Sequence, residues 1–114
     1  MKTKLLLLHG ALGSRQQFEP WKKILADSFE VFDFNFSGHG GYLIDGPFSI
    51  DQFVQDTMAI INENDLDSPN IFGYSMGGYV ALKLAHDFPG SVNRIITLGP
   101  NFDGLQNRLP KRLE

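Results

Sequence analysis

The residues most able to do chemistry lie at positions 73–77, whose sequence Gly-Tyr-Ser-Met-Gly fits the pattern G-x-S-x-G. In this pattern a sharp strand-to-helix turn holds a serine hydroxyl above the end of a sheet, where it can act as a nucleophile. An apolar run ends at Phe72 and a helical pattern begins near Tyr79, so the order strand, turn, helix is present. A small-residue turn without chemistry is the competing interpretation of the pattern alone. The glycines on either side of Ser75 have a predicted steric role, because a β-carbon there would collide with a neighbouring strand or helix.

Composition limits what else the chain can be. Its 114 residues are 42% hydrophobic and 20% charged, which predicts one soluble globular domain over residues 1–114. A net charge of −3 gives no reason to expect nucleic acid or a membrane surface as a partner. The absence of cysteine excludes disulfides, thiolate metal sites and a cysteine nucleophile. The apolar run near the N-terminus is too short for a signal peptide, and we expect a cytoplasmic protein.

Strands and helices are predicted to alternate along the chain, which is typical of a parallel sheet with helices on both faces. Ser49 and Gln52 form a capping box, in which each side chain bonds the other residue's free N–H. Segment 99–114 has no clear element, although residues 105–113 could form a short helix. The predicted strands are 5–8, 29–35, 71–74 and 92–98, and the predicted helices are about 17–27, with Phe18, Trp21, Ile24 and Leu25 at helical spacing, 50–64 and 76–87.

Three motifs, in this order along the chain, resemble those of the α/β-hydrolase superfamily. The first is His9-Gly10 after the first strand, and the third is the serine turn at 73–77. The second, residues 35–40, is similar to the family's D-x-P-G-H-G loop but departs from it at Asn35 and Ser37. The resemblance implies a partial α/β-hydrolase fold with three αβα layers and strand order 2-1-3-4. Right-handed crossovers then place the first helix on one face and the next two on the other.

The resemblance also implies roles for particular residues at the carboxyl ends of the first and third strands. Ser75 would be the nucleophile, and the backbone N–H groups of Met76 and Ala11 would form the oxyanion hole, with Leu12 as the alternative to Ala11. Leu12 and Tyr74 would line the substrate pocket. The implied reaction is cofactor-independent hydrolysis of a small-molecule ester, thioester or similar acyl bond through an acyl-enzyme.

The proton acceptor is harder to find, since in this family the base is a histidine that follows the nucleophile. Only His86 follows Ser75, and eleven helical positions separate the two by roughly 16 Å. His39 belongs to a motif whose histidine is structural in the family, and His9 is expected to shape the oxyanion loop. Asp103 is the candidate acid, against the alternative of a solvated aspartate in a turn.

We therefore expect the N-terminal half of such a hydrolase, nearly inactive by itself because the triad histidine is missing. Its fourth strand would form an unpaired sheet edge, open to a second copy of the chain or to the missing C-terminal half. Two alternatives remain. One is a lyase or carbon–carbon bond hydrolase on the same fold, and the other is a degenerate domain that binds without catalysing.

Overall fold

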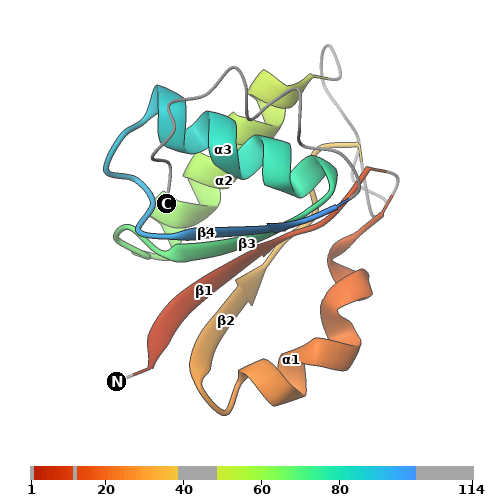
Figure 1. Cartoon of the computed structure of the whole chain (residues 1–114). Coiled ribbons are helices and arrows are strands. Elements are labelled where there is room, and N and C mark those ends of the chain that lie inside the picture. The colour runs from red at the N-terminus through yellow and green to blue at the C-terminus, as the bar shows by residue number, and fades with distance from the viewer. Residues whose placement is uncertain (1, 12, 39–48, 100–114) are drawn as a thin grey trace.

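A computed structural model of the chain describes residues 2–11, 13–38 and 49–99 (Figure 1). Strands and helices alternate within these ranges as predicted. The elements are β1 (Thr3–Leu8), the 3₁₀ helix η1 (Arg15–Phe18), α1 (Glu19–Leu25), β2 (Phe29–Asp33), α2 (Ile50–Glu63), β3 (Asn70–Tyr74), α3 (Met76–Asp87) and β4 (Ile95–Leu98).

The four strands form one parallel sheet in the order β2-β1-β3-β4, which confirms the predicted topology. Figure 1 shows α2 and α3 on one face of the sheet and α1 on the other, as right-handed crossovers require. The order of the strands changes direction between β1 and β3, so their carboxyl ends flank the position at which ligands bind in open α/β sheets.

Strand β1 is apolar throughout its second half because both of its faces are covered. Leu6 and Leu8 belong to the larger core, on the side of α2 and α3, while Leu5 and Leu7 pack with Phe18 on the side of α1. The larger core also contains Phe34, Phe36, Phe53, Val54, Ile61, Leu66, Ile71, Val80, Ala81 and Leu84.

Helix α2 begins where the sequence predicts, since the Ser49 hydroxyl accepts a hydrogen bond from the N–H of Gln52 at 3.1 Å. The second half of the predicted capping box is not found among the described residues. The Gln52 side chain is held instead by Asp56 one turn along the helix, because its Nε2 donates to Asp56 Oδ1 at 3.0 Å.

The first helix differs from its prediction. It is divided into η1 and α1 and ends at Leu25, and only Phe18 of its four apolar residues is fully buried. Trp21 is 45% exposed and Ile24 is 73% exposed, so the helical spacing of these residues does not correspond to a fully buried face. Helix α1 has only seven residues, and a hollow bordered by Trp21 remains beside it.

Two strands are shorter than predicted because side chains and turns take over their backbone groups. After β2 the N–H of Phe36 donates to His9 Nε2, and before β4 the N–H of Asn93 donates to the carbonyl of Pro69. Both segments therefore leave the regular strand. The predicted short helix at 105–113 and most of the long loop before α2 lie outside the described residues. Every helix in the described ranges is too short or too polar to cross a lipid bilayer.

Candidate active site

Ser75 occupies a strained turn between β3 and α3. Its φ of +53° and ψ of −113° lie in a region that residues with a β-carbon seldom adopt. The turn is held on both sides, because Ser75 N–H donates to Leu98 O at 2.7 Å and Ser75 O accepts from Gly78 N–H at 2.9 Å. The backbone around this serine is therefore fixed by β4 as well as by α3.

The Ser75 hydroxyl is not used to cap the helix that follows it. Ser14 and Ser49 precede helices in the usual extended conformation, and their hydroxyls accept hydrogen bonds from the first turn. Ser75 stands at the same position relative to α3 but makes no such bond. A serine that is strained and yet does not stabilise its helix is suited to a chemical role.

Glycines on both sides make this turn possible, which confirms their predicted steric role. A β-carbon on Gly73 would lie 2.5 Å from Gly77 O. One on Gly77 would lie 2.8 Å from His9 O and 2.7 Å from the carbonyl carbon of Leu8. The start of α3 therefore packs directly on the backbone at the end of β1, and this contact brings the serine turn beside the loop after β1.

His9 is fully buried in that loop and its protonation state can be deduced. The N–H of Phe36 can only donate, so His9 Nε2, 3.1 Å away, must accept. Nδ1 then carries the hydrogen and donates to Gly10 O at 2.7 Å. Both ring nitrogens are thus engaged with the backbone, as a residue that shapes the loop requires, and neither can serve as a base for Ser75.

Gln17 also holds this loop, although no pattern in the sequence predicts this role. Its Oε1 accepts a hydrogen bond from Gly10 N–H at 2.9 Å. Gly13 makes room for this side chain, since a β-carbon on Gly13 would lie 2.6 Å from the same oxygen. A glycine beside a 3₁₀ helix could have suggested a close contact of this kind, but not its partner.

Ala11 and Met76, the predicted oxyanion donors, follow two neighbouring strands at the same edge of the sheet. None of the described residues accepts a hydrogen bond from either N–H group. Met76 is the first residue of α3, where N–H groups have no intrahelical partner and the helix dipole favours negative charge. Tyr74 lies beside them, with its ring against Gly10. Leu12 and Asp103 lie outside the described residues.

The loop after β2 is held by a carboxylate that the sequence analysis did not identify. Asp56 on α2 accepts hydrogen bonds from the backbone N–H of Ser37 at 2.8 Å and from its hydroxyl at 3.0 Å. Asn35, the other departure from the family motif, bonds the N–H of Arg15 at 2.8 Å. Both unusual residues therefore have partners that hold this loop. His39 lies outside the described residues.

His86 lies at the opposite end of α3 from Ser75, as its position in the sequence implies. It is exposed, and its Nδ1 lies 3.0 Å from Asp87 Oδ1. This hydrogen bond, together with that from Lys83, holds the pKa of Asp87 below its ordinary value. His86 is therefore hydrogen-bonded to Asp87 on the surface, away from the serine.

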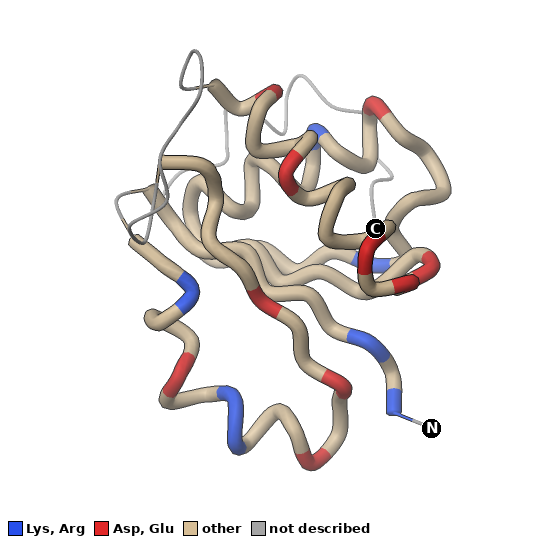
Figure 2. Tube along the Cα trace, turned by 180° about the vertical axis from the view of Figure 1, so that it is seen from behind, with Lys and Arg blue, Asp and Glu red and all other residues tan. Residues whose placement is uncertain are grey.

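Ion pairs fix η1 and α1 to the sheet edge. The buried Asp33 carboxylate at the end of β2 lies 2.6 Å from Arg15 Nη2 and 2.9 Å from Lys22 Nζ. Close contact with Asp33 raises the pKa of Lys22 above its ordinary value. Figure 2 shows charges of both signs along η1, α1 and β2. The segment that carries Gln17 is thus tied to β2 by charge.

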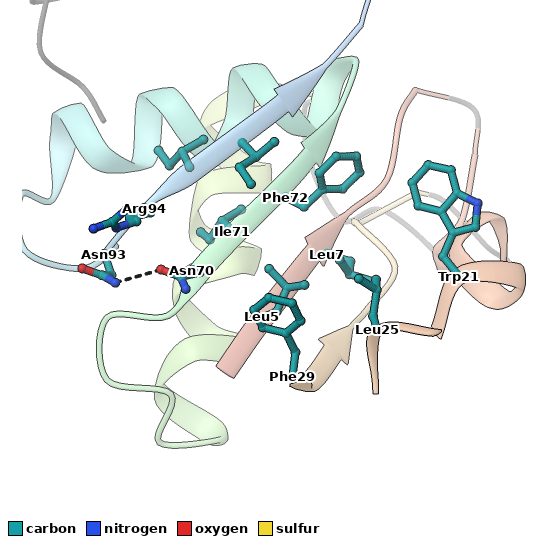
Figure 3. A pocket seen from close by; sticks show the side chains of 12 residues that line it. Leu5, Leu7, Trp21, Leu25, Phe29, Asn70, Ile71, Phe72, Asn93 and Arg94 are labelled. Atoms are coloured by element: carbon teal, nitrogen blue, oxygen red, sulfur yellow. Dashed lines mark hydrogen bonds between the residues drawn. The ribbon is translucent and has the colours of Figure 1, made fainter. Parts of the chain in front are cut away.

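A large hollow in the described part of the chain does not lie at the serine. It measures about 770 Å³ and opens on the face where α1 packs (Figure 3). Asn70, Asn93 and Arg94, from the amino ends of β3 and β4, border it, and Phe72 and Ile96 form part of its floor. Substrates of α/β proteins bind at the carboxyl ends of strands, so this hollow is an uncovered sheet face and not a substrate pocket.

Comparisons with known proteins agree with this geometry. The profile of a family described as alpha/beta hydrolase fold matches residues 4–113. Over 96 residues the chain is 29% identical to a probable alcohol acetyltransferase of Wickerhamomyces anomalus, and over 95 residues it is 30% identical to 3-oxoadipate enol-lactonase 2 of Acinetobacter baylyi. These matches cover 82% and 80% of the chain.

Among solved structures, a marine microorganism esterase has a TM-score of 0.80 and 29% identity over 85% of the chain. The chain spans only part of these proteins. It covers 28% of the acetyltransferase, 35% of the enol-lactonase and 37% of the esterase.

Proposed function

This chain belongs to the α/β hydrolase family, and we propose that it carries the nucleophile half of a hydrolase that cleaves an ester, thioester or similar acyl bond through an acyl-enzyme on Ser75. The observation that carries the proposal is the strained Ser75, whose hydroxyl does not cap α3. A conformation that costs about 1–3 kcal/mol is retained only where the surrounding structure enforces it, and such residues cluster at active sites.

In this mechanism Ser75 Oγ attacks the acyl carbon while a base removes its proton. The N–H groups of Met76 and Ala11 stabilise the oxyanion that forms. The leaving group departs with a proton, and water then releases the acyl group. Two features support the oxyanion assignment: both N–H groups lack partners among the described residues, and Gly77 packs on the backbone of His9.

The base is supplied from outside residues 1–114, because in this family it follows the nucleophile and His86 is the only histidine after Ser75. His9 has both ring nitrogens engaged with the backbone, and His86 lies at the far end of α3. Loss of a whole catalytic triad typically lowers turnover about a millionfold. Residues 1–114 alone should therefore show almost no turnover, while a longer protein that contains them should be active.

In the longer protein, further polypeptide pairs with β4 and covers the hollow beside α1. This proposal is supported by the relatives, of which the chain covers about a third, and by Ile96, which is 64% exposed on an edge strand. Pairing of β4 with a second copy of the chain is the alternative. Light scattering on residues 1–114 separates the two, because a monomer excludes the homodimer.

The nucleophile is tested by labelling the full-length protein with a fluorophosphonate and locating the adduct by mass spectrometry. We expect one adduct, on Ser75, and none in Ser75→Ala. Ser28→Ala, which alters an exposed serine in the turn before β2, should label normally. The proposal is wrong if the adduct lies elsewhere, or if Ser75→Ala hydrolyses p-nitrophenyl acetate at the normal rate.

Acyl transfer to an alcohol is a second candidate, favoured by the 29% identity to a probable alcohol acetyltransferase. The acyl-enzyme would be the same, with an alcohol in place of water in the second step. Adding ethanol to the ester assay separates the two reactions. Accumulation of an ethyl ester at the expense of free acid would identify a transferase, and free acid alone would identify a hydrolase.

A further inference from the structure

The peptide group between Gly10 and Ala11 links the candidate oxyanion donor to two side chains outside the catalytic group. A trans peptide is planar, so its C=O and N–H point in opposite directions. No cis peptide occurs in the described residues. Any contact that fixes the carbonyl of Gly10 therefore also fixes the direction of the Ala11 N–H.

Two donors hold that carbonyl. His9 Nδ1–H lies 2.7 Å from Gly10 O, and Gly13 N–H lies 3.1 Å from it. The His9 ring is itself fixed by the N–H of Phe36 and by the Phe36 ring, whose centroid lies 4.8 Å away. The loop after β2 thus sets the orientation of a peptide in the loop after β1.

Gln17 holds the preceding peptide by accepting the Gly10 N–H at 2.9 Å. Gln17 lies on η1, which is anchored by the Ser14 hydroxyl and by two contacts of Arg15, its backbone N–H to Asn35 and its guanidinium to Asp33. Gly10 is therefore held at both its N–H and its C=O. Rotation of the Gly10–Ala11 peptide would break the two bonds to Gly10 O, and rotation of the peptide before it would break the bond to Gln17.

Magnitudes indicate that the Gln17 bond contributes little to folding. Gln17 is an exposed residue, and ordering such a long side chain costs rotamer entropy. This cost is of the same order as the stability that one hydrogen bond contributes, so the two nearly cancel. The remaining effect of the Gln17 hydrogen bond is to orient the loop after β1.

We propose that Gln17 and His9 are positioning residues that fix the Gly10–Ala11 peptide so that the Ala11 N–H faces the oxyanion formed at Ser75. This inference rests on the proposed acyl-enzyme function. Neither residue touches the reacting atoms. Both act through the backbone of Gly10, and their loss should weaken stabilisation of the transition state more than binding of the substrate.

The test uses Gln17, because replacing the buried His9 would remove the hydrogen bond from the Phe36 N–H and one of the two donors to Gly10 O, and would disturb the core. Gln17→Leu removes the acceptor and keeps most of the bulk, whereas Gln17→Glu keeps an acceptor oxygen at the same reach. Gln16→Leu is the matched control, since Gln16 is an exposed glutamine one position earlier on η1. All three are made in the full-length protein and assayed with a p-nitrophenyl ester.

We expect Gln17→Leu to lower kcat about tenfold with KM nearly unchanged, less than the hundredfold or more that follows complete loss of an oxyanion donor. Phosphonylation of Ser75 should slow by a similar factor. Gln17→Glu should recover most of kcat, Gln16→Leu should match the unaltered protein, and melting temperatures should stay close together. Equal kcat for Gln17→Leu and Gln16→Leu would overturn the inference.

The two proposals fail in different ways. If Ser75→Ala abolishes labelling and turnover while Gln17→Leu keeps full kcat, the acyl-enzyme stands and the positioning role is wrong. If Ser75→Ala keeps full turnover, the acyl-enzyme is wrong and the positioning role falls with it. A rise in KM alone for Gln17→Leu also contradicts positioning, because it would place Gln17 in substrate binding.

Discussion

The two faces of the sheet differ in how completely they are covered. On the face of α2 and α3, the strand residues Leu6, Leu8 and Ile71 are almost fully buried. On the other face α1 and Phe18 cover Leu5 and Leu7, but a hollow of about 770 Å³ remains beside them. The serine turn is joined to the covered face through α3. The described residues therefore form the backbone of the candidate site, whereas they leave the opposite face of the sheet partly uncovered.

The largest expected effect tests the contact between the covered face and the end of β1. Gly77→Ala should lower the free energy of unfolding by about 3 kcal/mol or more, because the new methyl group would meet the backbone of Leu8 and His9, which cannot move aside. Gly13→Ala is the matched control on the side of α1. It meets the end of the flexible Gln17 side chain and should cost less than about 1 kcal/mol.

Urea denaturation of both variants measures this difference. Equal losses of stability would mean that the start of α3 does not pack on β1 as described.

The next effect compares the same substitution on the two faces. Ile71→Ala removes a side chain that is 1% exposed and should cost about 3 kcal/mol. Ile96→Ala, on the neighbouring strand, removes a side chain that is 64% exposed and should cost less than about 1 kcal/mol. The comparison is made by denaturation of residues 1–114. A large loss for Ile96→Ala would show that its face is already covered, by a second copy of the chain or by another segment.

Relief of strain should give a smaller effect of opposite sign. Ser75→Gly should raise the free energy of unfolding by about 1 kcal/mol, because glycine adopts the positive φ at little cost. Ser75→Ala keeps the β-carbon and should give no gain. Thermal melts of the two variants separate strain from loss of the hydroxyl. Equal stability of both would mean that the turn is not strained.

The smallest effect concerns the ion pairs that fix α1. The pKa of Lys22 is raised above 10.5, chiefly by Asp33, so its stabilising contribution is complete below that pH and is lost as the pH rises through the raised value. Melting temperatures between about pH 9 and pH 12 should therefore fall more steeply in the unaltered chain than in Lys22→Gln.

Lys23→Gln, which alters the exposed neighbouring lysine, should keep the steep fall. A fall that is the same in all three proteins would mean that the contact between Lys22 and Asp33 does not contribute to stability.

Patterns that depend on local chemistry could be predicted from the sequence. Helix α3 has the predicted bounds because the glycine-bracketed turn and the residues before Pro89 mark its ends. Helix α2 follows the predicted segment 50–64, and Phe53, Val54 and Ile61, which recur at helical spacing, are buried in it. Strand order followed from the resemblance, and the structure agrees with it.

Contacts between distant segments could not be predicted. Ile24 has the predicted helical spacing and is nevertheless 73% exposed, because spacing does not reveal whether a second element covers that face. Gln17 on η1 contacts Gly10, and Asp56 on α2 contacts Ser37, only because a helix and a distant loop come together at one edge of the sheet. Such side chains follow no periodic pattern, so a single sequence carries no signal for them.

The Ser75 amide proton is hydrogen-bonded to the carbonyl of Leu98 on the edge strand β4, so its exchange reports whether β4 is in place. Its exchange with deuterium requires β4 to separate from β3, whereas the amides inside α3 exchange when the helix opens. The protection factor of this single amide therefore reports the free energy of opening the edge strand. Any partner that adds to β4 should slow exchange at Ser75 before it changes any other property of the site.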